Sequence, residues 1–240
     1  MKAARQLTFA ASLAACASLA HAGPADKVYQ PIVEYREAEV ELRGGHVRDS
    51  DPAINTEQQY VLDLGYGVTP WWFTEAVGNF KREPGDSVRF DAYEFENIFQ
   101  LTEQGKYWAD LGFFVEYEHP KAKGDPDEIE FGPMIQKQFG ATINTLDLFA
   151  SRQLGPGREK KTHGEYRFQS EWRGGWAVNP GVQAFGDLTG DDKTALLGPA
   201  VFGETRIGGN KLKFDAGLPI GLNDSSPDFI IRWQLEFEFR

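Results

Sequence analysis

The feature that most constrains the fold is an alternation of apolar and polar side chains with a period of two, repeated along almost the whole chain. It is clearest near the C-terminus, where the positions of one parity are all apolar: Phe229, Ile231, Trp233, Leu235, Phe237 and Phe239. The intervening positions include Arg232, Gln234, Glu236 and Glu238. Successive side chains of a β-strand point to opposite faces of a sheet, so this period predicts strands with one apolar and one polar face. The chain is therefore predicted to be all-β.

The alternation recurs in about 12 segments, most of them close to the length with which a tilted strand crosses a bilayer. We predict strands at 31–48, 57–66, 71–82, 88–101, 106–118, 128–138, 143–154, 164–176, 181–187, 195–206, 211–220 and 228–239. The gaps between them are short and long in turn, and the long ones are rich in Asp, Gly, Pro and Lys. Short turns on one side and longer loops on the other are typical of a transmembrane antiparallel up-and-down β-barrel, which is the fold we predict. A soluble β-domain with an aromatic core is the alternative.

The first residues indicate export. Lys2 and Arg5 precede an apolar run from Leu7 to Leu19, and Ala20-His21-Ala22 forms a small-x-small cleavage site. We expect residues 1–22 to be a signal peptide and 23–240 to be the barrel. The tetrapeptide ending at Cys16 also resembles a lipobox, so lipidation at Cys16 is the alternative. Cleavage after residue 22 leaves a mature chain without cysteine, which excludes disulfides and thiol chemistry.

The charge of the chain excludes one class of partner. The formal net charge is −11, and it becomes more negative when the basic leader is removed. Such a chain repels nucleic acid. After the leader, no segment approaches about 18 uninterrupted apolar residues, so no transmembrane helix is expected.

The C-terminal pattern carries a family resemblance. Trp233, Leu235, Phe237 and Phe239 resemble the signal that outer-membrane barrels present to the barrel-assembly machinery, although Arg240 follows the final aromatic residue here. The strand-turn-strand over 64–75 is similar to that of uncharacterised proteobacterial barrels described as porin-like or as transporters. This resemblance implies an outer-membrane location in a Gram-negative bacterium, and it implies no catalytic residues.

The loops suggest a lipid partner. Acidic pairs such as Asp49 with Asp51 suit divalent cations that bridge lipopolysaccharide phosphates, and basic residues such as Lys121 suit the phosphates themselves. Ordinary turn formation and solubility explain both sets equally well or better.

Catalytic motifs are absent from the sequence: it has no Gly-x-Ser-x-Gly, no His-Glu-x-x-His and no P-loop. His46, His119 and His163 fall at loop-side ends of strands that are not neighbours. We therefore expect no enzyme activity, no cofactor and no metal. An enzyme acting at the rim is the weakest of the alternatives.

Strand parity predicts a charged lumen. The acidic wall consists of Glu94, Glu96, Asp110, Glu116, Glu118 and Glu130, and the luminal basic residues are Arg167, Arg173, Arg206, Lys213 and Arg232. Ionised groups require water or ion pairs around them. The aromatic residues predicted to narrow this lumen are Phe90, Trp108, Phe114, Phe149, Phe185 and Phe202, and no loop is long enough to form a large plug.

These features predict a porin-like channel for small solutes that prefers cations, because acidic rings attract them. A structural or surface-interaction barrel with a filled lumen is the alternative. The sequence names neither the solute nor the oligomeric state.

Overall fold

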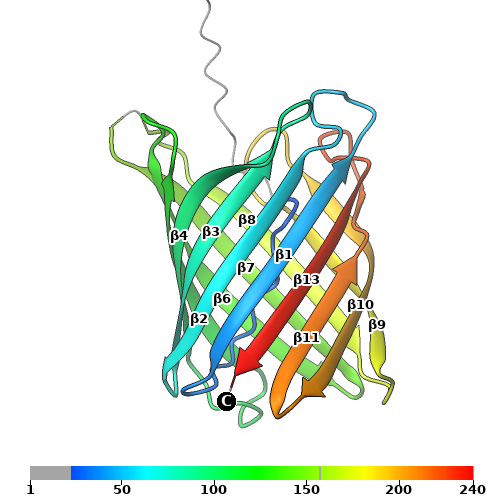
Figure 1. Ribbon diagram of the computed structural model, residues 1–240. Helices are drawn as coiled ribbons and strands as arrows, with labels where there is room; N and C mark the ends of the chain where they lie inside the picture. Colours follow the sequence, from blue (N-terminus) through cyan, green and yellow to red (C-terminus); the bar gives the residue numbers. More distant parts are fainter. Residues whose placement is uncertain (1–22, 157, 240) are drawn as a thin grey trace, which may run out of the picture.

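The computed structural model describes residues 23–156 and 158–239, and these residues form a closed β-barrel (Figure 1). The strands are β1 Ala38–Arg48, β2 Gln58–Thr69, β3 Trp72–Arg82, β4 Arg89–Gln100, β5 Asp110–Pro120, β6 Asp127–Phe139, β7 Thr142–Leu154, β8 His163–Trp172, β9 Val178–Asp187, β10 Ala195–Ile207, β11 Asn210–Gly217, β12 Ile220–Gly221 and β13 Phe229–Phe239. Among the described residues, no helix is long and apolar enough to cross a membrane.

From β1 to β11 each strand pairs antiparallel with the next, β11 pairs with β13, and β1 closes the barrel on β13 from Ala38↔Phe239 to Arg48↔Phe229. The short strand β12 continues β11: both keep one register with β10 and with β13. The barrel wall thus has 12 crossings, and the predicted up-and-down barrel is confirmed.

The barrel has two unlike ends. At the turn end, close turns join β2 to β3, β6 to β7 and β10 to β11, and β13 ends there (Figure 1). The connections at the other end, the loop end, are longer. One prediction fails at the turn end, where the connection 101–109 is longer than the predicted turn at 102–105.

Two prolines lie inside strands of the wall. The register of β6 continues past Pro133 and that of β10 past Pro199, so neither marks a bulge. The ladder between β6 and β7 lacks only the pairs at Gly132 and Pro133, because proline offers no N–H. The register shifts lie instead at Gly67/Thr69 and at Asn79/Phe80.

The two faces of the wall differ in chemistry as the alternation predicts. The outer face exposes large apolar side chains on strands around the barrel, among them Leu64, Phe95, Leu197 and Leu235. The inner face carries buried polar residues such as Glu41, Asp63 and Glu75. Apolar surface turned outward around a closed ladder is the arrangement that a lipid bilayer requires.

The first strand begins later than predicted. We expected a strand over 31–48, but β1 starts at Ala38, and residues 23–37 form no strand. Pro31 lacks an N–H to donate to a ladder, and Arg36 has a φ of 66°, which lies outside the β region. This segment runs inside the barrel (dark blue in Figure 1).

Candidate functional site: a plug in the lumen

Residues 23–37, here called the plug, extend through the barrel between its two ends. Gly23 and Pro24 lie beside Gln59 and Gly45, which belong to the loop-end halves of β2 and β1. Arg36 and Glu37 exchange backbone hydrogen bonds with Gly67 at the turn end, with N···O distances of 2.8 and 2.9 Å. The plug therefore lies along most of the length of the lumen.

Barrel side chains bind the backbone of the plug. The N–H groups of Ala25, Tyr29 and Val33 donate to the side chains of Gln59, Asp147 and Gln100, at 3.2, 2.8 and 2.8 Å. These three donors are four residues apart, so each stretch of plug has one anchor on a different part of the wall. A buried backbone without a ladder needs such partners, since unpaired N–H groups are costly in free energy.

Two arginines complete this support at the carbonyl groups. Arg43 Nε donates to Ala25 O at 3.0 Å, and Arg232 donates to Asp26 O. Arg167 Nε lies 3.8 Å from the carboxylate of Asp26. The loop-end half of the plug is thus held from β1, β8 and β13.

An aromatic contact anchors the middle of the plug. Tyr29 is buried, and its ring centroid lies 4.3 Å from that of Phe114 and 5.9 Å from that of Phe149. Val33 extends this apolar cluster toward the turn end, with Phe73, Ile98 and Met134 of the wall. Burial of this surface stabilises the plug inside the barrel through the hydrophobic effect.

The charged contact of the plug is Lys27. Its Nζ lies 3.3 Å from Glu41, 3.2 Å from Asp63 and 2.9 Å from Glu75. All four side chains are buried. The carboxylates come from β1, β2 and β3, and Glu41 and Asp63 are register partners. Neighbouring strands thus bring residues distant in sequence to one ammonium group.

Glycines of the wall make room for the plug. A Cβ added at Gly45 would lie 1.8 Å from Pro24 O, and one at Gly67 would lie 2.0 Å from Glu34 O. At Gly112 it would lie 2.7 Å from the Cβ of Pro31. Only glycine permits the plug to lie this close to the wall at these positions.

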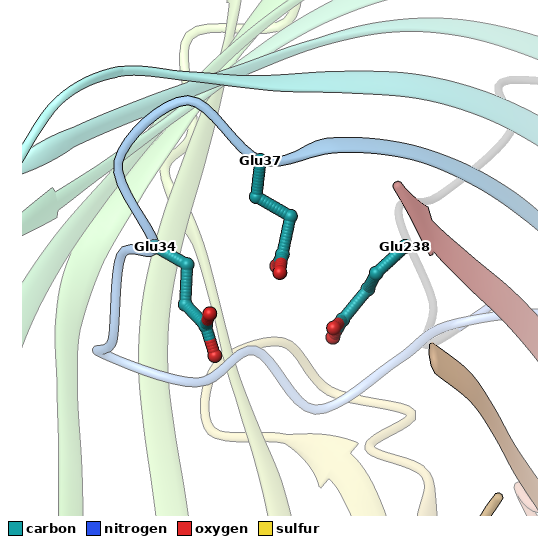
Figure 2. Close-up of side chains that lie close together, drawn as sticks. All are labelled: Glu34, Glu37 and Glu238. Carbon is teal, nitrogen blue, oxygen red and sulfur yellow. The ribbon is translucent and has the colours of Figure 1, made fainter. Parts of the chain in front are cut away.

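At the turn end, the plug turns through Glu34–Glu37 beside an open recess of about 400 Å³. Figure 2 shows the carboxylates of Glu34, Glu37 and Glu238 directed toward one another, close enough to share a metal ion. Lys211 lies 3.5 Å from Glu34 and also pairs with Glu238. Lysine already supplies positive charge here, so the geometry does not require a metal.

The predicted acidic wall falls into two groups. Glu94, Glu96 and Glu130 are buried in the lumen, and Glu116 and Glu118 are their register partners on β5. Oxygens of Glu94, Glu116 and Glu118 lie within 4.8 Å of one another. Asp110 does not join them, because it accepts a hydrogen bond from Gly105 N and holds the connection 101–109.

The predicted luminal basic residues also fall into two groups. Arg167 pairs with Glu130 at 3.0 Å and with Glu165, and Lys213 pairs with Glu236 at 2.8 Å. Arg232 stacks on Phe185. In contrast, Arg173 lies after the end of β8, and Arg206 is exposed near the end of β10. These two residues therefore lie near the turn end, outside the enclosed part of the lumen.

Among the predicted luminal aromatics, Phe114, Phe149, Phe185 and Phe202 are buried. Trp108 is exposed in the connection 101–109, because β5 begins later than predicted. Phe90 packs on Phe80 and on the exposed ring of Tyr93, since the register shift at Asn79/Phe80 changes its parity.

The three histidines do not form one site. His119 bonds Asp127 at 2.6 Å and His163 lies 3.4 Å from Glu159, while His46 stands on β1. Within the described ranges, the groups of acidic residues close enough to share a metal contain no histidine.

The middle of the lumen is filled. Luminal residues from several strands, including Asp63, Glu96, Thr145 and Asp147, have 0% exposure. Water therefore does not reach these side chains while the plug is in place.

Sequence reasoning missed the plug because it assigned 31–37 to the first strand and considered only loops as plugs. The prolines at 24 and 31 were the available signal.

Comparison with known proteins supports the fold. No protein-family model matches the chain, and no curated protein matches it. Among solved structures, an outer membrane channel from Pseudomonas putida F1 is similar, with a TM-score of 0.56 and 13% identity over 91% of this chain and 100% of that chain. A bacterial polysaccharide outer membrane secretin has a TM-score of 0.42 and 8% identity over 86% of this chain and 100% of that one. With its closed ladder and apolar outer face, the chain has the fold of a bacterial outer-membrane β-barrel.

Proposed function

We propose that the protein is an outer-membrane channel for small solutes, and that the plug closes it. The observation that carries this proposal is the way the plug is held. Between residues 25 and 33 its backbone is bound by barrel side chains, whereas the ladder of the wall closes between β1 and β13 without it. Removal of the plug thus breaks no strand pairing. The hydrogen bonds of Arg36 and Glu37 to Gly67 provide a fixed end about which the rest moves.

We further propose that the opened lumen prefers cations. Loss of Lys27 from the lumen leaves Glu41, Asp63 and Glu75 without that counter-charge, and Glu94, Glu116 and Glu118 line the neighbouring wall. Carboxylates at close quarters attract cations, and a wall of low dielectric strengthens the field. The similarity to a solved outer membrane channel is consistent with this proposal and contributes only at the level of fold.

A structural barrel with a permanently filled lumen is the second candidate, and the full burial of Glu96 and Asp147 favours it. The two candidates differ in whether the plug leaves. Both share a proposed placement in the outer membrane of a Gram-negative bacterium after cleavage of residues 1–22, which lie outside the described residues. They also share contact with lipid and lipopolysaccharide, and assembly through the C-terminal signal on β13.

Two tyrosines of the plug provide the test. Tyr29→Asp places a carboxylate between Phe114 and Phe149 and beside Asp147, which expels the plug. Tyr35→Asp is the matched control, because Tyr35 is 50% exposed at the turn end. In planar bilayers we expect larger and more frequent conductance steps from Tyr29→Asp than from wild type or Tyr35→Asp. Equal and negligible conductance from all three folded proteins would favour the structural barrel.

A further inference from the structure

The group of carboxylates around Lys27, here called the cage, consists of Glu41, Asp63, Glu75 and Glu96. Each member is at most 1% exposed. The cage holds one ammonium group, whose three N–H donors match the three carboxylates of Glu41, Asp63 and Glu75. The occupant belongs to the plug and not to the wall, so the cage is a binding site that the barrel presents and the plug fills.

The cage has more acceptors than its cations use. Arg43 is its other cation: it donates to Glu41 at 2.6 Å, pairs with Asp63 and lies 3.7 Å from Glu96. Within the described residues, Asp63 Oδ1, Glu75 Oε2 and both carboxylate oxygens of Glu96 are buried without a hydrogen-bond partner. Buried acceptors of this kind are costly unless a donor reaches them. Four carboxylates thus face two cations, and the departure of Lys27 leaves them with Arg43 alone.

We propose that the cage is a binding site for the primary ammonium group of a small cationic solute, and that Lys27 is its built-in competitor. This inference rests on the proposed function in one respect, since a solute enters the cage only when the plug has moved. The chemistry selects a primary ammonium. Three carboxylate oxygens converge on one nitrogen at 2.9–3.3 Å, which suits three N–H donors on one atom. A planar guanidinium prefers two parallel bonds, and a quaternary ammonium has no donor.

Chemical rescue tests the site without requiring conduction. Lys27→Ala removes the three methylene groups and the ammonium group beyond Cβ and leaves a space of that shape, so n-propylammonium is the probe. We expect the midpoint of heat-induced unfolding, measured in detergent by the gel shift of the folded barrel, to fall in Lys27→Ala. Propylammonium at about 100 times its Kd is expected to raise this midpoint by roughly 5–10 °C in a saturable manner.

Several controls isolate the charge and the donors. Propan-1-ol has the same chain without the charge, and tetramethylammonium has the charge without donors, so neither is expected to rescue Lys27→Ala. Lys27→Met keeps the space filled and is expected to respond to none of the probes. Lys161→Ala, at a lysine whose side chain is 72% exposed, controls for loss of any lysine.

The outcomes are distinct. Saturable rescue by propylammonium alone supports the cage as an ammonium site, whether or not the barrel conducts. Equal effects of propylammonium, propan-1-ol and tetramethylammonium overturn it. If Lys27→Ala does not refold in buffer, recovery of the folded barrel in propylammonium supports the proposal, and failure to recover in every solution overturns it. The conductance of Tyr29→Asp tests the proposed function separately.

Discussion

Replacement of Gly45 by alanine adds one methyl group at the point where the plug lies closest to β1. The new Cβ would lie 1.8 Å from Pro24 O and 2.2 Å from Pro24 C. Since non-bonded heavy atoms settle about 3.5–4 Å apart, the plug has to move by more than about 1 Å. This shift separates Ala25 from Arg43 Nε and from Gln59, which now bind it at 3.0 and 3.2 Å.

The magnitude follows from those two contacts. A hydrogen bond to a charged group contributes about 1.5–3 kcal/mol and a neutral one about 1 kcal/mol. Their loss destabilises the plugged state by about 2–4 kcal/mol, and at 1.4 kcal/mol per factor of ten this raises the ratio of open to closed channels about 30- to 700-fold. The barrel itself tolerates alanine, because an added methyl group does not interrupt the ladder of β1.

Gly44→Ala is the matched control. Gly44 is the neighbouring residue on the opposite face, where the three atoms nearest to an added Cβ are side-chain atoms of Trp233 and Tyr60, at 2.9–3.0 Å. Open probability in planar bilayers is the assay, and the gel shift on heating verifies that both variants form barrels. The reasoning is refuted if folded Gly45→Ala and Gly44→Ala have the same open probability.

Three further predictions concern the wall and the N-terminus. Arg167→Gln leaves Glu130 and Glu165 buried without their cation, so it is expected to lower the free energy of unfolding by about 3–5 kcal/mol. The control Arg206→Gln, at an exposed residue, is expected to change the free energy of unfolding by less than about 0.5 kcal/mol. Denaturant titration measures both variants, and equal losses would contradict the burial argument. In the Tyr29→Asp background, replacing Glu94, Glu96 and Glu116 with Gln is expected to reduce the preference of the channel for cations, most at low salt where screening is least. Reversal potentials under a salt gradient measure this preference. A preference of the Tyr29→Asp channel itself for anions would refute the electrostatic argument. Intact-mass measurement is expected to show a mature chain that starts at Gly23, whereas an acylated chain starting at Cys16 would show lipidation instead.

The strands and their faces were predictable because their signal is local. A period of two can be recognised from neighbouring residues alone. Because successive side chains of a strand point to opposite faces, this period defines an inner and an outer face. The alternation therefore located every wall strand to within a few residues at most ends, and it placed Leu235 and Phe239 on the outer face. It failed where parity changed or strands ended early, as at Phe90, Trp108 and Arg173, because a register shift or a strand end depends on the partner strand.

The plug and the cage depended on tertiary structure. The sequence determined that the lumen is lined with carboxylates, since parity places Glu94 and Glu96 there. Only the closed barrel determines that Lys27 contacts Glu41, Asp63 and Glu75. These carboxylates lie on three strands, and the register between the strands brings them together. Residues 23–37 carry no periodic signal for a coil inside a barrel, and their conformation follows from contacts with side chains such as Asp147 and Gln100, far along the chain. Local patterns determine which face of the sheet a side chain occupies. The segment that fills the lumen is determined by contacts with residues from many strands of the wall.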